Sequence, residues 1–164
     1  NPGSKKVGVR IAVVALVTLL GIGFCTKTHS AESYRSISAG ATVVRGASSV
    51  VDLSVSYPEA GPGDSSIEVG VTFIGMSNFK GVEQRNNFAW HAAIIDGFGN
   101  FDVGIGPAYL QNTDTYNGSH LNFVLLLGYR FERWPVTVRL QHFSNGGTTD
   151  VNKGRDMVIV GWRF

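Results

Sequence analysis

The sequence of 164 residues predicts an all-β protein, an eight-stranded antiparallel transmembrane β-barrel of the outer membrane. The first observation is a repeated pattern, in which about ten residues of alternating apolar and polar character are followed by a turn-rich break. The second is that no long apolar stretch follows residue 31, so a transmembrane helix is not expected there. The third is the number of segments, because eight strands of ~9–11 residues form the smallest common transmembrane barrel.

Residues 1–30 are expected to be a signal peptide that is cleaved, which leaves residues 31–164 as a single β-barrel domain. Basic residues precede an apolar run of 15 residues that ends at Cys25. That run is shorter than the ~20 residues that a spanning helix needs. Cleavage after Ser30 fits the small residues at this point better than cleavage after Ala31. A retained membrane anchor is the alternative.

Eight segments of the remaining chain show the alternation, and each is bounded by residues that favour turns. The first is the weakest, since its outward positions include two alanines. The sixth is the strongest, with apolar or aromatic residues at every second position. The predicted strands are 36–45, 50–57, 65–75, 87–96, 100–111, 120–132, 134–144 and 156–164.

The parity of the side chains assigns the two faces of the predicted sheet. One face is larger and more aromatic, and we expect it to meet lipid; Leu53, Val71, Leu125 and Val160 belong to it. A soluble barrel would instead turn this face inward, and alternation alone does not decide between the two. The opposite face balances three acids with three arginines, which favours a lumen filled by a salt-bridged polar plug over an ion path. Its polar members are Asp52, Glu68, His91, Asp102, Arg130, Arg139 and Arg163.

The predicted connections alternate in length, as they do in outer-membrane barrels with both termini in the periplasm. The long ones, expected outside the cell, are 76–86, 112–119 and 145–155. The short ones, expected on the periplasmic side, are 97–99 and Arg133. The first hairpin and the turn after it depart from this rule.

Two single residues carry further information about the strands. Pro107 lies inside the fifth predicted strand, where a closed ladder needs an N–H, and this indicates a bulge. The chain ends on Phe164 at the end of an alternating strand, which resembles the C-terminal signal of bacterial outer-membrane barrels.

Composition excludes several classes of function. The chain has 14 Lys and Arg against 12 Asp and Glu, but four of the basic residues lie in the first 30, so the rest of the chain carries 10 against 12. A basic surface for nucleic acid is therefore not indicated. One cysteine excludes a disulfide framework, and the four separated histidines show no metal-ligand spacing. We also find no glycine-rich phosphate loop.

Three polar residues interrupt the lipid-facing parity near the ends of the last two strands. His142 and Ser144 continue the outward face of the seventh strand, and Asp156 continues that of the eighth. Because these strands are antiparallel neighbours, all three groups should meet at the extracellular end. An ionisable group that faces lipid is costly and therefore indicates function. The alternative is a hydrated rim at the headgroups.

These residue types suit acyl transfer. Two residues along a strand are separated by about 7 Å, so the imidazole of His142 can take the proton of Ser144 as that hydroxyl attacks an ester. Asp156 can orient the imidazole. The predicted oxyanion donors are Asn145, Asn152, Gly146 and Gly147.

The run His142-Phe143-Ser144-Asn145-Gly146-Gly147, followed by Asn152, Gly154 and Asp156, resembles the last hairpin of the lipid A 3-O-deacylase family (PagL type). That family's pattern is His-aromatic-Ser-Asn-x-Gly, then Asn-x-Gly-x-Glu and an alternating strand ending in Phe. The resemblance implies that His142 is the base, Ser144 the nucleophile and Asp156 the acid, with Asn152 at the oxyanion. The sequence departs from the pattern at Asp156, where the family has Glu. Asp150 in the loop is a nearby substitute.

The resemblance implies an outer-membrane serine esterase that removes the 3-O-linked hydroxyacyl chain from lipid A of lipopolysaccharide. Its active site would face the outer leaflet, with no metal or organic cofactor, in a membrane-embedded monomer or homodimer. The alternatives are another lipid enzyme, a phospholipase or a lipid A acyltransferase, and a non-catalytic small barrel.

Overall fold

The structure is a computed structural model that describes residues 34–58, 60–115 and 117–164. The predicted signal peptide lies outside these residues. Within the described ranges, no helix is long and apolar enough to cross a membrane. The long strands are β1 (Tyr34–Thr42), β2 (Ser49–Tyr57), β3 (Ser66–Ile74), β6 (Asn87–Phe98), β7 (Phe101–Leu110), β8 (Leu121–Arg130), β9 (Val136–Ser144) and β10 (Arg155–Arg163).

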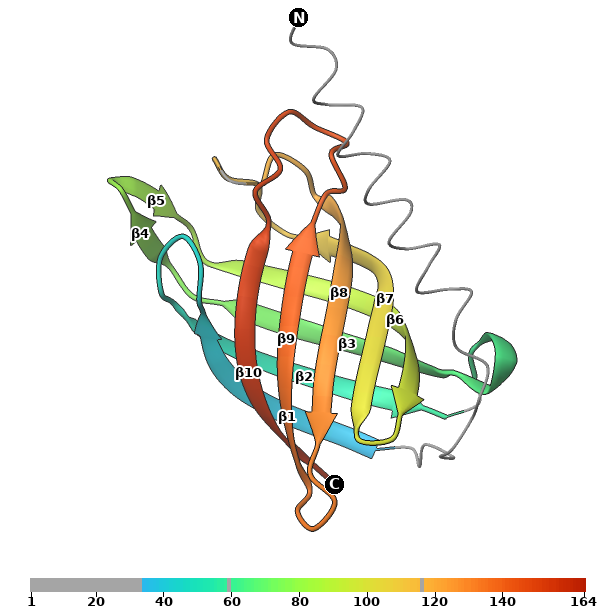
Figure 1. Cartoon of the computed structure of the whole chain (residues 1–164). Helices are drawn as coiled ribbons and strands as arrows, with labels where there is room; N and C mark the ends of the chain where they lie inside the picture. Colours follow the sequence, from blue (N-terminus) through green and yellow to red (C-terminus); the bar gives the residue numbers. More distant parts are fainter. Residues whose placement is uncertain (1–33, 59, 116) are drawn as a thin grey trace, which may run out of the picture.

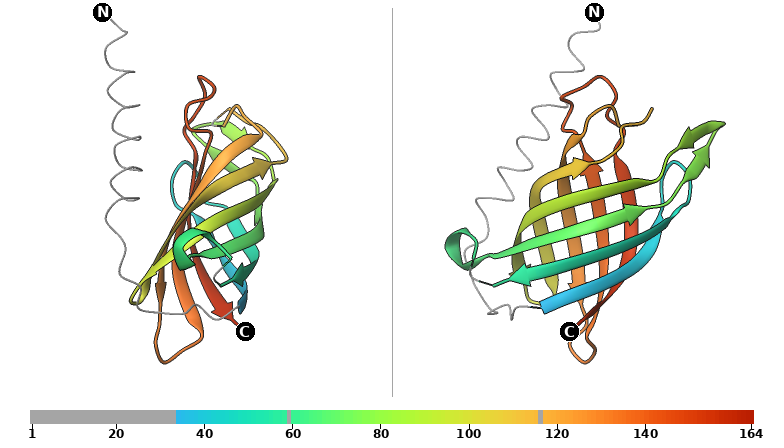
Figure 2. Two further views of the ribbon diagram at one scale, coloured as in Figure 1. Left: turned by 90° about the vertical axis from the view of Figure 1, so that its right-hand side faces the viewer. Right: turned by 180° about the vertical axis from the view of Figure 1, so that it is seen from behind.

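These eight strands close into one barrel in the order β1-β10-β9-β8-β7-β6-β3-β2, and every neighbouring pair is antiparallel (Figures 1 and 2). Closure joins the first strand to the last, with Ser36 opposite Arg163 and Thr42 opposite Met157. The predicted eight-stranded antiparallel β-barrel is confirmed. Because closure pairs both edges of the sheet, no long strand is left with an open edge.

The two ends of the barrel differ in their connections. The loop end carries the connections 43–48, 75–86, 111–120 and 145–154. The turn end carries 58–65, 99–100 and 131–135, together with the C-terminus. The turn between β2 and β3 contains a short 3₁₀ segment, η1 (Pro62–Asp64).

The connection between β3 and β6 is a hairpin that the sequence did not predict. Two short strands, β4 (Ser77–Phe79) and β5 (Val82–Gln84), pair with each other and project from the loop end (Figure 2). Three residues are too few for an alternation pattern, so this segment looked like a loop.

The predicted bulge at Pro107 is wrong. The register between β6 and β7 is the same on both sides of Pro107, from His91 opposite Ala108 to Ile94 opposite Ile105, so no extra residue is inserted. The ladder omits the pair opposite Pro107 and the pair next to it, while Pro107 still pairs with Phe123 of β8. Neighbouring Gly106 lets the backbones approach closely, because a Cβ there would collide with the carbonyl oxygen of Ala92.

The predicted parity is confirmed by the exposure of the side chains. Leu53, Leu125 and Val160 are 48%, 43% and 51% exposed on the outer wall. Glu68 and Arg139 are buried in the lumen, where the Arg139 guanidinium donates to both carboxylate oxygens of Glu68 at 2.6 and 2.9 Å. Glu68 and Arg139 on the inner face therefore pair with each other, as expected for a plug.

The lumen differs from the prediction in its second half. Toward the turn end it is charged, and Asp102 forms the predicted ion pair with Arg130 at 3.1 Å. Toward the loop end, beside buried polar side chains such as Gln141 and Asn87, inward positions also hold large hydrophobic side chains that are fully buried. These include Ile74, Leu110, Phe143, Met157 and Ile159. The lumen beneath the predicted site is thus filled by both apolar and polar side chains.

Aromatic side chains form two rows on the outer wall. At the turn end, Tyr129 makes edge contacts with Phe101 and Phe131, both at 5.1 Å between ring centroids. At the loop end, Trp90 contacts Tyr109 at 6.0 Å. Two such rows around an apolar band are the girdles typical of outer-membrane barrels.

Candidate active site

His142 and Asp156 form a pair across the β9–β10 ladder. They occupy directly opposed positions in the register, and the Nδ1 of His142 lies 2.7 Å from Oδ1 of Asp156. Both side chains are 33% exposed on the outer wall. A hydrogen bond from Nδ1–H to the carboxylate leaves Nε2 as the basic nitrogen, which is the arrangement that a general base needs.

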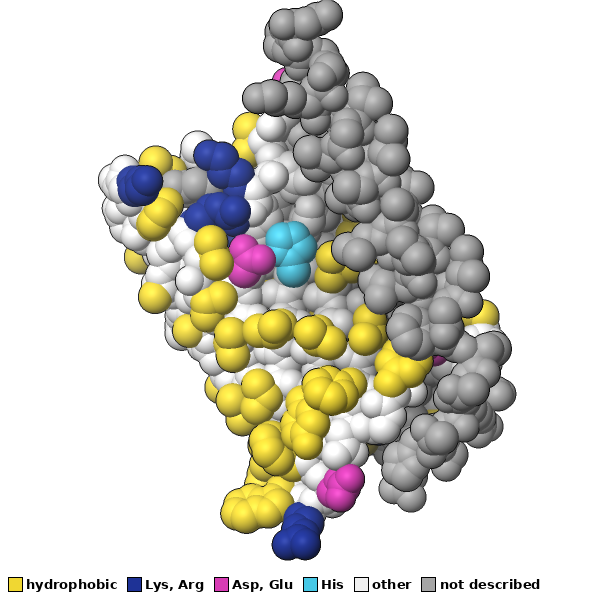
Figure 3. All heavy atoms as spheres, viewed as in Figure 1, with side chains coloured by type: hydrophobic (Ala, Val, Ile, Leu, Met, Phe, Trp, Pro, Cys, Tyr) yellow, Lys and Arg dark blue, Asp and Glu magenta, His cyan; other side chains and the backbone are white. Residues whose placement is uncertain are grey.

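The surface around this pair is polar on one side and apolar on the other. Figure 3 shows a histidine and an acidic side chain side by side on this face, with basic side chains next to them and hydrophobic side chains over the wall below. On the other side of β9, the residue opposite His142 is Leu125 of β8. The predicted polar interruption of the apolar outer wall is therefore present and local.

Ser144 ends β9 on the same face, opposite Phe123 of β8. Its hydroxyl donates to Oδ1 of Asn152 at 2.9 Å, and the N–H of Gly146 approaches the Ser144 Oγ at 3.3 Å. The described contacts include no hydrogen bond from Ser144 to His142. His142 and Asp156 of the predicted triad are thus hydrogen-bonded to each other, while Ser144 is hydrogen-bonded to Asn152 of the β9–β10 connection.

The four predicted oxyanion donors form two groups: two of them contact Ser144, and the other two make contacts within the β9–β10 connection. Asn145 is buried, and its side chain donates to Oγ1 of Thr149 and the carbonyl of Val151, at 2.7 and 2.8 Å. The side-chain Oδ1 of Asn145 also accepts a hydrogen bond from the N–H of Gly147 at 2.9 Å. These two residues are therefore engaged in shaping the loop, whereas Gly146 and Asn152 contact Ser144.

Gly154 makes room for the imidazole. Its φ of +66° lies in the left-handed region, where glycine is favoured. A Cβ at this position would lie 2.5 Å from Cε1 of His142 and 2.7 Å from the carbonyl oxygen of Phe143. The glycine in the motif is thus explained by close packing against the proposed base.

Arg45 belongs to the site, and sequence reasoning missed it. The residue lies in the β1–β2 connection, and its Nη1 is 3.4 Å from Oδ2 of Asp156. The same nitrogen donates to the carbonyl oxygens of Lys153 and, at 3.3 Å, Gly154. No sequence signal could have found it, because a lone arginine in a loop has no pattern and its partner lies 111 positions away.

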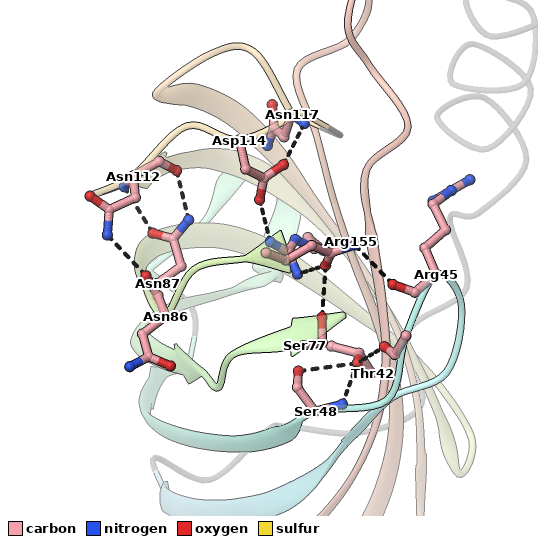
Figure 4. Close-up of polar contacts among 12 residues, drawn as sticks. Thr42, Arg45, Ser48, Ser77, Asn86, Asn87, Asn112, Asp114, Asn117 and Arg155 are labelled. Carbon is pink, nitrogen blue, oxygen red and sulfur yellow. Dashed lines mark hydrogen bonds and ion pairs between the residues drawn. The ribbon is translucent and has the colours of Figure 1, made fainter. Parts of the chain in front are cut away.

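A polar network ties the connections at the loop end together (Figure 4). Arg155, at the start of β10, is buried and contacts both Gln84 of β5 and Asp114 of the β7–β8 connection. Gln84 in turn donates to the backbone carbonyl of Arg45 at 2.8 Å. The loops that surround the His142–Asp156 pair are thus joined by side chains as well as by the barrel.

A groove of about 410 Å³ runs along the outer wall beside the pair. Its walls are mostly apolar, and its polar edge is formed by His142 and Asp156. The outward apolar residues that line it are Val43, Val44, Leu125, Leu127 and Leu140. This shape and polarity suit a hydrocarbon chain whose ester group lies at the loop end.

The structure distinguishes the two aspartates considered as the acid beside His142. Asp156, rather than Asp150, contacts His142. In the described part of the chain, no group of three or more His, Cys, Asp or Glu side chains could hold a metal ion.

Comparison with known proteins gives a family match and a structural match. A family model described as "Lipid A 3-O-deacylase (PagL)" matches residues 86–164. The structure also resembles the "Crystal structure of the outer membrane enzyme PagL", with 18% identity and a TM-score of 0.61 over 80% of this chain and 98% of that chain. No curated protein matches the sequence. The segment matched by the family contains His142, Ser144 and Asp156, whereas Arg45 lies outside it.

Proposed function

We propose that this chain, which is similar over residues 86–164 to the family of lipid A 3-O-deacylases (PagL), is an outer-membrane serine esterase that removes the 3-O-linked hydroxyacyl chain from lipid A of lipopolysaccharide. The observation that carries the proposal is the His142–Asp156 hydrogen bond on the outer wall, beside Ser144 and an apolar groove. An ionisable pair at a lipid-facing position is costly and is retained where it has a function.

We assign the loop end to the cell surface, where lipopolysaccharide forms the outer leaflet. The longer connections at this end support that orientation. The substrate then reaches the groove by lateral diffusion, with its acyl chains already in the hydrocarbon layer. Its ester group stops at the polar edge formed by His142 and Asp156.

The first chemical step is acylation of Ser144. The hydroxyl turns from Asn152 to Nε2 of His142, and its proton moves to that nitrogen as Oγ forms a bond to the ester carbonyl carbon. Asp156 holds Nδ1–H and stabilises the imidazolium. The bond to the sugar 3-oxygen then breaks, and that oxygen takes the proton from His142.

The second step is hydrolysis of the acyl-enzyme. A water molecule gives a proton to Nε2 of His142 and attacks the acyl carbon. The bond to Ser144 Oγ breaks, and the proton returns to that oxygen. The products are a free hydroxy fatty acid and lipid A with a free 3-hydroxyl group.

We assign the oxyanion role to Gly146 and Asn152, and a supporting role to Asn145 and Gly147. The N–H of Gly146 already points at Ser144 Oγ, so it is placed for an oxygen that develops on the attached carbon. The amide of Asn152 donates after it rotates, since its oxygen faces Ser144 in this structure. Asn145 and Gly147 keep the loop in shape through hydrogen bonds of the Asn145 side chain to Thr149, Val151 and Gly147.

Product analysis tests the proposal. The purified barrel in detergent is incubated with lipid A and, separately, with phospholipid, and the products are identified by mass spectrometry. We expect free hydroxy fatty acid from lipid A and none after Ser144→Ala. Release from phospholipid alone would make the protein a phospholipase, and a gain of acyl mass on lipid A would make it an acyltransferase. No product from either lipid would return it to the non-catalytic barrels.

A further inference from the structure

We propose that Arg45 is a positioning residue for the His142–Asp156 pair, acting on the carboxylate oxygen that His142 does not use. The inference rests on the proposed esterase function. Asp156 Oδ1 lies 2.7 Å from the imidazole and Oδ2 lies 3.4 Å from the Arg45 guanidinium. The carboxylate is thus held from two sides, by His142 of β9 and by Arg45 of the β1–β2 connection.

Asp156 needs such a second contact because its last torsion is soft. The terminal torsion of an aspartate is broad, so one hydrogen bond does not fix the plane of the carboxylate. The side chain is also 33% exposed, which lets water compete for the free oxygen. A cation on Oδ2 keeps Oδ1 directed at Nδ1 of His142.

Arg45 is itself held in place more firmly than an ordinary loop arginine. Its φ of 62° lies in the left-handed region, which is uncommon for a residue with a side chain. Gln84 binds its backbone carbonyl at 2.8 Å, and the guanidinium reaches the carbonyls of Lys153 and Gly154. Figure 4 shows the Arg45 side chain directed away from the buried network that anchors its backbone.

The competing role for a basic residue at this rim is direct binding of an anionic group on the substrate. The two roles differ in which kinetic parameter changes. A residue that orients the acid affects the transition state and lowers kcat, whereas a substrate contact present in both states raises KM. They also differ in their dependence on Asp156, because a positioning residue has nothing to orient once that carboxylate is removed.

The experiment compares Arg45→Gln and Arg45→Lys with Arg133→Gln, which makes the same loss of charge at the exposed turn end. Steady-state kinetics on lipid A are measured for each, in the wild-type and Asp156→Ala backgrounds. We expect Arg45→Gln to lower kcat roughly tenfold with little change in KM, as for loss of one hydrogen bond to a charged group. Arg45→Lys should restore part of the rate, and Arg133→Gln should behave as wild type. In Asp156→Ala, Arg45→Gln should cause no further loss.

A wild-type kcat in Arg45→Gln, an increase confined to KM, or an undiminished loss in the Asp156→Ala background would each overturn the proposal. Ser144→Ala in the same assay reports separately on the esterase function, since its full activity would refute that function. A second measurement needs no turnover. In the Ser144→Ala protein, the downfield Nδ1–H proton resonance of His142 should be sharp, and Arg45→Gln but not Arg133→Gln should broaden or remove it. An unchanged resonance in Arg45→Gln would contradict the positioning role.

Discussion

Gly154 is the residue at which one added methyl group would most directly displace the proposed base. We predict that Gly154→Ala lowers esterase activity on the order of 10²-fold, because a misplacement of about 1 Å at a reacting group can cost that much. The matched control is Gly81→Ala in the β4–β5 turn, where φ is also positive but no atom lies within 4 Å of the added Cβ. Kinetics on folded protein check the result. Equal activity in the two variants would show that His142 tolerates the displacement.

Asp156 stands where the pattern of the lipid A 3-O-deacylase family has Glu. The contacts around Asp156 lead to a specific prediction. The carboxylate already reaches His142 at 2.7 Å and Arg45 at 3.4 Å, so the site is complete with the shorter acid. We therefore expect Asp156→Glu to lower kcat, because the extra methylene moves the carboxylate out of both contacts. Asp156→Ala should cost less than Ser144→Ala or His142→Ala. A higher rate in Asp156→Glu would show instead that aspartate is a compromise.

The residues of the site differ in how far the sequence could predict them. His142, Ser144 and Asp156 were predicted as site residues because polar residues at outward positions of an otherwise apolar face are conspicuous. Arg45 was not found, because its contact with Asp156 depends on closure between β1 and β10. The hydrogen bond from Ser144 to Asn152 depends on a side-chain rotamer and on the loop backbone, neither of which a spacing pattern contains.

At the scale of the elements, β9 joins the outer wall to the lumen. Its outward positions carry His142 and Ser144, and its inward positions carry Arg139 and Phe143. Arg139 reaches across the lumen to Glu68 of β3, and both side chains are buried. The plug therefore holds the strand that carries the proposed base and nucleophile.

This pairing gives a test of the plug. Removing one partner leaves a buried charge unpaired, which costs about 3–5 kcal/mol, whereas replacing both with apolar residues is often close to neutral. We predict that Glu68→Met and Arg139→Met each lower the free energy of unfolding more than the double variant does. Unfolding by guanidinium in vesicles measures the three values. A double variant that loses the sum of the two single losses would exclude coupling between the charges.

The elements show which features of a barrel can be predicted from alternation. The long strands were predicted because each buries one parity and exposes the other, so a shift by one residue would invert a whole face. The β4–β5 hairpin was missed because three-residue strands carry no measurable period. The buried apolar residues under the site were not predicted, because the inward face was assigned from its charged residues. Phe143 and Met157 also occupy inward positions and are buried.

At the scale of the whole molecule, the outer wall should respond to charge according to depth in the bilayer. Leu53 lies at the middle of β2 and is exposed on the wall, so Leu53→Arg should destabilise the barrel by about 2–4 kcal/mol. Met76, beyond β3 at the loop end, is also exposed, and Met76→Arg should cost about 0–1 kcal/mol. Folding equilibria in lipid vesicles measure both. Equal costs would mean that this wall is not embedded as proposed.

In its membrane, the whole molecule is proposed to be a closed barrel that presents Ser144 to lipid A in the outer leaflet. The most direct measurement is mass spectrometry of lipid A from bacteria that express this chain with Ser144 intact or changed to Ala. If this proposal is right, lipid A loses one hydroxyacyl chain, at the 3 position, in cells with Ser144 and stays unmodified in cells with Ser144→Ala. The same loss in both strains, or unmodified lipid A in both despite folded barrel in the outer membrane, would contradict it.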